Sequence, residues 1–127
     1  LHGNRMNTLP SGEDIESAFL NLTDLEADAY LINCCGANFV GEAIKKLSAL
    51  SNKPIGGYAN SENITTSTKS SSTITNAEDI QKLFKSELNE EKYSSEVMNW
   101  INSGASIVGG CCRTRPSYIK RLKEILK

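Results

Sequence analysis

The apolar residues of this chain fall into three short runs and several longer stretches with helical spacing. The runs predict strands at residues 30–33, 54–58 and 106–109, because short apolar runs bounded by turn residues are typical of buried strands. Stretches with helical spacing lie before, between and after the runs. Strands that alternate with helices indicate parallel pairing and helical crossovers.

Five segments place apolar residues on one face of a helix. Ser11 is the expected cap of the first, with Asp14 three residues later as in a capping box. The second is expected to begin at Asn38, the fourth to end at Gly104, and the fifth to begin near Pro116. The side chains expected to be buried are Ile15, Ala18, Phe19 and Leu22; Ala43, Ile44, Leu47 and Leu50; Ile80, Leu83, Phe84 and Leu88; Tyr93, Val97, Trp100 and Ile101; and Ile119, Leu122, Ile125 and Leu126.

Residues 63–76 differ from the rest of the chain, because they are mostly Ser, Thr and Asn and show no periodicity. Ile64 and Ile74 are the only large apolar side chains among them. A segment with so little to bury is typical of a surface loop. We therefore expect a flexible excursion that could be shortened without unfolding the rest of the protein.

The length of the chain limits the architecture. Three parallel strands alone form a thin sheet with unpaired edges. A complete barrel of alternating strands and helices needs about 250 residues, and 127 residues supply roughly half of that. The chain also starts at Leu1 in mid-pattern, which suggests a piece of a longer protein. The predicted fold class is therefore α/β, the C-terminal part of a (β/α)8 TIM barrel.

The charge and the cysteine usage limit the possible binding partners and the cellular environment of the protein. The net charge of −1 offers no basis for binding nucleic acid or an anionic membrane. No apolar run approaches the roughly 20 residues of a membrane helix. The four cysteines form two adjacent pairs, which is a poor disulfide framework. We therefore expect a reducing, cytoplasmic environment.

The two cysteine pairs are the candidate chemistry of the chain. Cys34-Cys35 and Cys111-Cys112 each follow a predicted strand directly, so they can converge although about 75 residues separate them. Adjacent strand side chains point to opposite faces, so the second pair can share a metal only if the chain turns, as Gly109-Gly110 would permit. Three thiolates with an open fourth position suit a catalytic zinc. The alternatives are a structural site closed by four cysteines, or small buried residues without a metal.

Three motifs together resemble the homocysteine S-methyltransferase family. They are Asn33-Cys34 after one strand, Asn60-Ser61 after the next, and the segment at residues 109–116, Gly-Gly-Cys-Cys-Arg-Thr-Arg-Pro. The resemblance implies a (β/α)8 barrel in which residues 1–127 form part of the homocysteine-binding domain, about strands six to eight, without its N-terminal strands. It also implies zinc ligands at Cys34, Cys111 and Cys112, with Cys35 outside the ligand set.

The resemblance further implies a reaction. Zinc would activate the thiol of homocysteine, which would take a methyl group from a sulfonium donor, S-methylmethionine or S-adenosylmethionine, and give methionine. Asn60 and Ser61 match a segment near the substrate. Ala59 and Glu62, however, stand where the family usually has Pro and Gly, so this loop departs from the family pattern. The alternative function is that of a non-enzymatic or degenerate zinc-binding paralogue, and the chain alone is expected to be inactive.

Overall fold

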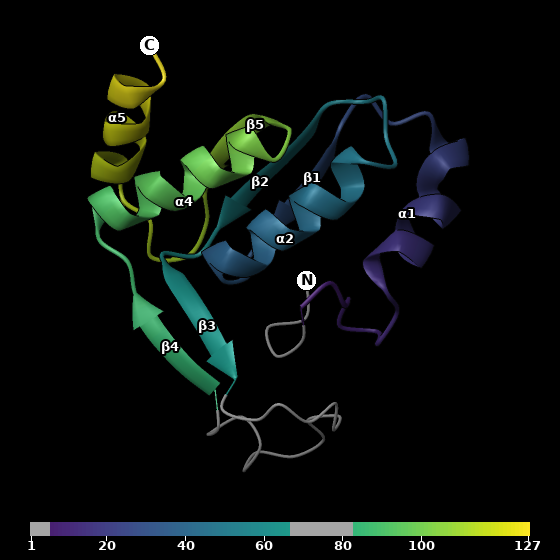
Figure 1. Cartoon of the computed structure of the whole chain (residues 1–127), viewed down its shortest axis with the longest axis horizontal. Coiled ribbons are helices and arrows are strands. Elements are labelled where there is room, and N and C mark those ends of the chain that lie inside the picture. Colours follow the sequence, from purple (N-terminus) through teal and green to yellow (C-terminus); the bar gives the residue numbers. More distant parts are fainter. Residues whose placement is uncertain (1–5, 67–82) are drawn as a thin grey trace.

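The protein is an α/β structure built on a three-stranded parallel sheet in the order β1-β2-β5. A computed structural model describes residues 6–66 and 83–127. In Figure 1 the helices α2 and α4 lie along the sheet, α1 and α5 lie at its two sides, and the β3–β4 hairpin extends away from it. None of the described helices is long and apolar enough to span a bilayer. The helices are α1 (Ile15–Leu22), a 3-10 turn η1 (Thr23–Leu25), α2 (Ala37–Ser48), α4 (Glu90–Asn102) and α5 (Pro116–Ile125), and the strands are β1 (Tyr30–Asn33), β2 (Ile55–Ala59), β3 (Glu62–Thr66), β4 (Leu83–Glu87) and β5 (Ala105–Gly110).

One face of the parallel sheet is covered by helices. Ile32, Gly57 and Val108 stand side by side on the three strands and share that face. A side chain at Gly57 would meet Val40 of α2, since an added Cβ atom would lie 2.4 Å from its Cγ1. The absence of a side chain on β2 therefore lets α2 pack closely on the sheet, and this packing fixes the chain that leads out of β1.

The opposite face of the sheet is bare in the described residues. The neighbouring row contains Leu31, Gly56 and Ile107, which alternate with the covered row and so point the other way. Leu31 is 41% exposed and Ile107 is 39% exposed. Parallel sheets are normally buried on both faces. Among the described residues, this sheet therefore differs from most parallel sheets in having one uncovered face.

Two aromatic residues of α4 are buried, as their helical spacing predicts, and connect α4 to the neighbouring elements. Tyr93 and Trp100 are completely buried and pack edge to face. The indole N–H of Trp100 donates to the carbonyl of Ala37 at the start of α2. The Tyr93 hydroxyl lies 3.1 Å from the carbonyl of Ala59 and 2.8 Å from that of Gly109. Tyr93 therefore fixes the ends of β2 and β5 relative to each other.

The predicted helix through Leu83 and Leu88 is wrong, because Leu83–Glu87 form strand β4 instead. This strand pairs antiparallel with β3, which also occupies the first residues of the predicted loop at 63–76. Residues 67–76 of that loop, and Ile80 of the predicted helix, lie outside the described residues. The apolar spacing is compatible with a helix over this short stretch. The stretch forms a strand because it pairs with β3.

A side chain of α2 anchors the hairpin to the body. The Asn38 side chain accepts from the backbone N–H of Ile64 at 3.0 Å and donates to its carbonyl at 2.8 Å, as a neighbouring strand would. In return, the side-chain oxygen of Asn63 accepts from the N–H of Asn38. That bond caps a helix whose preceding residue, Gly36, has no side chain to do so. The hairpin is thus attached directly behind the first cysteine pair.

The predicted helix ends and buried faces need smaller corrections. The first helix is capped by Asp14, whose carboxylate accepts from the N–H of Glu16 at 2.9 Å, and not by Ser11. The last helix buries Leu122, as predicted, and also Tyr118, which the periodicity did not indicate. The predicted core residues Leu22, Leu50, Ile119 and Leu126 are between 40% and 46% exposed.

Candidate metal centre

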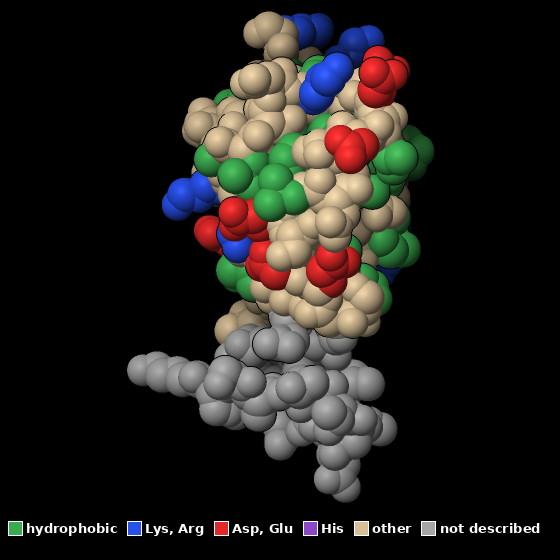
Figure 2. All heavy atoms as spheres, turned by 90° about the vertical axis from the view of Figure 1, so that its right-hand side faces the viewer, with side chains coloured by type: hydrophobic (Ala, Val, Ile, Leu, Met, Phe, Trp, Pro, Cys, Tyr) green, Lys and Arg blue, Asp and Glu red, His purple; other side chains and the backbone are tan. Residues whose placement is uncertain are grey.

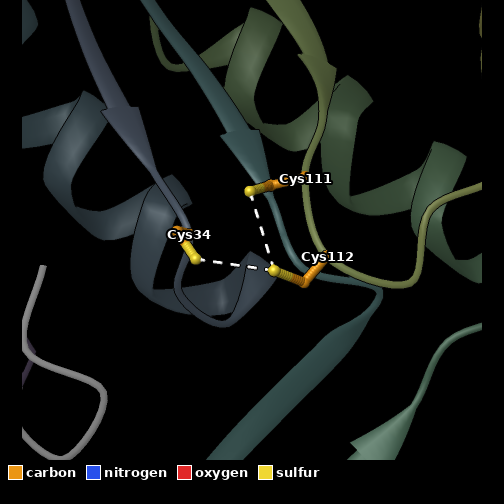
Figure 3. A group of neighbouring side chains, drawn as sticks. All are labelled: Cys34, Cys111 and Cys112. Atoms are coloured by element: carbon orange, nitrogen blue, oxygen red, sulfur yellow. Dashed lines mark hydrogen bonds between the residues drawn. The ribbon is translucent and has the colours of Figure 1, made fainter.

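Three cysteine thiols converge at the ends of two parallel strands. Cys34 directly follows β1, and Cys111 and Cys112 directly follow β5. The Sγ atom of Cys112 lies 3.7 Å from that of Cys34 and 3.9 Å from that of Cys111 (Figure 3). All three sulfur atoms lie within 4.8 Å of one another. Among the described residues, these cysteines are the one group of His, Cys, Asp and Glu side chains that could hold a metal ion.

The spacing of the sulfur atoms fits a zinc site. Zinc binds thiolates in tetrahedral geometry with a metal–sulfur distance of about 2.3 Å, which places two bound sulfur atoms roughly 3.8 Å apart. Two of the three distances agree with this value. Cys34 and Cys112 are exposed and Cys111 is half-buried, so the cluster is open to solvent. Three soft ligands around an accessible position suit zinc with a vacant coordination site.

The backbone leaves each strand abruptly so that the thiols can meet. Cys34 has a φ of 52°, in the left-handed region that costs a residue with a side chain about 1 kcal/mol or more. After β5, the N–H of Thr114 donates to the carbonyl of Cys111 and closes a turn in which Arg113 has a φ of 63°. The turn thus includes both Cys111 and Cys112, so the chain turns at the second cysteine pair, as the sharing of one metal requires. Gly109 and Gly110, which were expected to permit the turn, both still belong to β5, so the turn itself is formed by the residues after them.

Gly110 is required for a different reason. An added Cβ atom at this position would lie 2.4 Å from the Oγ1 atom of Thr114. The Thr114 hydroxyl donates to the carbonyl of Cys111 at 2.7 Å and so reinforces the turn. Gly110 therefore gives Thr114 the space to fold back over the second cysteine pair.

Neighbouring thiols disfavour ionisation in the metal-free cluster. The contact with the Cys112 thiol, followed by that with Cys111, raises the pKa of the Cys34 thiol to about 11. At neutral pH this thiol is protonated, so a metal ion must displace a proton to bind.

Cys35 is separate from the cluster. Its side chain is 1% exposed and belongs to the hydrophobic core, and burial raises the pKa of its thiol to about 11. It is absent from the group of side chains that could hold a metal ion. In the structure, Cys35 is therefore a small residue of the hydrophobic core.

The other two predicted site residues lie beside the cysteines, at the end of β2. Asn60 is half-buried, and its side-chain oxygen accepts from the backbone N–H of Cys112. Ser61 is completely buried, and its N–H donates to the carbonyl of Cys112 at 3.1 Å. Both residues thus contact the backbone of one cysteine.

The two unusual residues of this segment have clear structural roles. Ala59 is completely buried, and its carbonyl accepts from the backbone N–H of Cys111 at 2.8 Å. Glu62 is only 2% exposed and forms an ion pair with Arg113, the residue after the cysteine pair. Sequence reasoning noted both departures but could not foresee this pair, because nothing local connects residues 62 and 113. The pair ties the start of β3 to the turn after Cys112.

Breaking this ion pair should have unequal consequences. Arg113→Ala leaves a carboxylate in a buried position without its guanidinium, and we expect unfolding free energy to fall by about 2–4 kcal/mol. Glu62→Gln leaves Arg113, which is half exposed, to be hydrated by water, and should cost about 1 kcal/mol. Denaturant unfolding of the full-length protein measures both values. Equal effects, or a harmless Arg113→Ala, would show that the buried carboxylate does not depend on this pair.

Sequence comparison places the chain among methyltransferases. A profile of the family described as Homocysteine S-methyltransferase matches residues 1–126. Homocysteine S-methyltransferase 3 of Arabidopsis thaliana is 33% identical over 96 residues, which cover 75% of this chain and 24% of that protein. Selenocysteine methyltransferase of Astragalus bisulcatus is 32% identical over 123 residues, which cover 94% of this chain and 33% of that protein.

Structure comparison gives the same fold. The metallated form of the homocysteine methyltransferase MmuM from Escherichia coli matches with a TM-score of 0.65 at 22% identity, over 94% of this chain and 32% of that chain. Its apo form matches with a TM-score of 0.64 at 23% identity, over 93% and 35%. The chain thus spans about a quarter to a third of the length of the proteins it matches. With a family profile that matches almost its whole length, this chain belongs to the homocysteine S-methyltransferase family.

Proposed function

We propose that the chain is part of a zinc-dependent methyltransferase that moves a methyl group from a sulfonium donor to the thiol of homocysteine and so forms methionine. The observation that carries the proposal is the cluster of Cys34, Cys111 and Cys112, whose sulfur spacing fits zinc. We further propose that residues 1–127 form the part of the homocysteine-binding barrel around strands six to eight, at whose C-terminal ends barrel enzymes carry their active sites.

The three cysteines would hold the ion and leave its fourth position to the substrate. When bound, zinc supplies a Lewis acid that favours the deprotonated form of a thiol in that position. The exposed side chains of Cys34 and Cys112 leave the cluster open to a small thiol. Three thiolates carry more negative charge than the ion neutralises, which keeps a bound substrate sulfur electron-rich and nucleophilic.

The methyl transfer itself needs little from the protein. The sulfur of homocysteine attacks the methyl carbon, the bond from that carbon to the donor sulfonium breaks, and the donor leaves as a neutral thioether. No proton has to reach the leaving group, so no general acid is required. The nearby Tyr93 is not suited to such a role, because burial raises the pKa of its hydroxyl. S-Methylmethionine and S-adenosylmethionine both have the required sulfonium.

Free thiols in a metal site are kept reduced most readily in the cytoplasm, and we propose that the protein acts there. Neither nucleic acid nor a membrane has a part in the proposed reaction. Homocysteine and the sulfonium donor are its partners.

An activity assay with matched metal analysis tests the proposal. The full-length protein would be incubated with homocysteine and either donor, and with selenocysteine as a second acceptor, since one relative is a selenocysteine methyltransferase. We expect methionine to form and zinc to be present in about one equivalent. Zinc without methyl transfer to either acceptor would favour the alternative, a non-enzymatic zinc-binding paralogue. Protein that binds no zinc would overturn the proposal.

A further inference from the structure

The end of β2 contacts all three clustered cysteines although it contributes none of them. The backbone N–H of Cys34 donates to the carbonyl of Tyr58 at 3.2 Å, and that of Cys111 donates to the carbonyl of Ala59 at 2.8 Å. The N–H of Cys112 donates to the side-chain oxygen of Asn60 at 3.2 Å. Three consecutive residues of one segment therefore each hold the backbone of one cysteine.

Asn60 differs from the other two residues because it uses its side chain. β2 ends at Ala59, so beyond this point no strand pairing holds the chain that carries Cys112. The backbone N–H of Asn60 donates to the carbonyl of Cys35 at 2.9 Å, which attaches the same residue to the first cysteine pair. Asn60 therefore bridges the two cysteine pairs.

The next residue, Ser61, also binds the backbone of Cys112. The N–H of Ser61 donates to the carbonyl of Cys112 at 3.1 Å, so that both backbone polar groups of this cysteine are bound by residues 60 and 61. The Cys112 side chain itself is exposed and has the closest sulfur contacts to both other thiols. With so little packing around its side chain, the position of the Cys112 sulfur depends on its backbone.

We propose that Asn60 is a positioning residue of the metal centre, and that its side-chain oxygen sets the distance of Cys112 from the other two thiols. The inference rests on the proposed metal-binding function of the cluster. The expectation that Asn60 also lies near the substrate stays a prediction, because an amide that accepts the N–H of Cys112 keeps its two N–H donors for another partner.

Two substitutions of Asn60 separate its hydrogen bond from its bulk. Asn60→Leu keeps a side chain of similar size but removes the acceptor, and Asn60→Asp keeps the acceptor. Residues that orient metal ligands typically change metal affinity by about 10–100-fold when they are replaced. In the full-length protein we expect Asn60→Leu to weaken zinc binding by at least about 10-fold. Asn60→Asp should stay within roughly three-fold of the unmodified protein, because the hydrogen bond remains.

Zinc affinity would be measured by competition with a chromogenic chelator, and ligand geometry by the visible absorption of the cobalt(II)-loaded protein. The matched control is Asn102→Leu, the same change at an exposed position of α4. We expect altered cobalt bands only in Asn60→Leu. Unaltered affinity and bands in Asn60→Leu, with loss of homocysteine binding alone, would overturn the inference in favour of substrate binding. If the unmodified protein binds neither metal, the proposed function itself fails.

Discussion

Cys111→Ser or Cys34→Ser in the full-length protein should remove zinc binding and methyl transfer together. A serine hydroxyl is a poor substitute for a soft thiolate ligand, and two remaining cysteines leave the tetrahedral site half filled. We expect zinc content to fall below about a tenth of an equivalent after dialysis, and methionine formation to fall by at least about 100-fold. This is the large effect expected when a metal site loses a direct ligand rather than an orienting residue.

Cys35→Ser is the matched control for this experiment, because it makes the same chemical change one residue away from a proposed ligand. Its side chain is buried in the core. We expect a loss of stability of about 1–3 kcal/mol from burying a hydroxyl in an apolar site, with zinc content and activity mostly retained. Metal content and methionine formation would be measured on the same samples. Full activity in zinc-free Cys111→Ser protein would contradict the mechanism.

The second large effect concerns the 127 residues expressed on their own. We expect them to be oligomeric, insoluble or molten, and inactive toward homocysteine. Several large apolar side chains are between 39% and 70% exposed, on the uncovered sheet face and on the outer helices. They include Leu31, Ile107, Leu20, Leu25 and Ile119. Figure 2, which faces the side of α1, shows exposed hydrophobic side chains among acidic and basic ones.

The size of the effect follows from typical burial energies. Burying one large apolar side chain contributes about 1.5–3 kcal/mol. A few unburied side chains therefore amount to a large share of a typical net stability of about 5–15 kcal/mol. In addition, β1 and β5 each have one unpaired edge in the described sheet, and such edges can pair with another molecule.

Size-exclusion chromatography and thermal unfolding of the isolated chain test this expectation. Leu31→Lys together with Ile107→Lys should raise its monomer fraction, because charge on the bare face opposes association. The same pair of changes should destabilise the full-length protein, in which we expect that face to be buried. A monomeric chain with a cooperative unfolding transition would instead show an autonomous domain.

Local sequence patterns were sufficient to predict most of the helices and strands. The strands at β1, β2 and β5 lie within one residue of their predicted positions at each end. The helices α2 and α4 and the start of α5 at Pro116 also agree, as do the buried positions of Tyr93 and Trp100. These elements have clear apolar periodicity and distinct end signals, so that neighbouring residues alone specify them. The positions of both cysteine pairs directly after strands follow from the same information.

Pairing between distant segments accounts for what the patterns missed. The stretch around Leu83 has spacing compatible with a helix, and β4 forms because β3 offers a complementary strand. The outer face of α5 is apolar in sequence yet partly exposed, because the described residues leave much of Ile119 and Leu126 uncovered. Periodicity identifies an apolar face, but it does not identify the partner that covers it.

For the candidate metal centre, too, the sequence predicted some features and the tertiary structure revealed others. From the sequence alone, the two cysteine pairs indicated thiolate chemistry, and the motifs around them indicated the family and the set Cys34, Cys111 and Cys112. Only the tertiary structure brought these sulfur atoms to within 4.8 Å and separated Cys35 into the core. It also revealed that Asn60 holds the backbone of Cys112 and that Glu62 pairs with Arg113. The reason is physical: residue type and local spacing determine what a side chain can bind, whereas distances between thiols depend on parallel strands that join residues far apart in the chain.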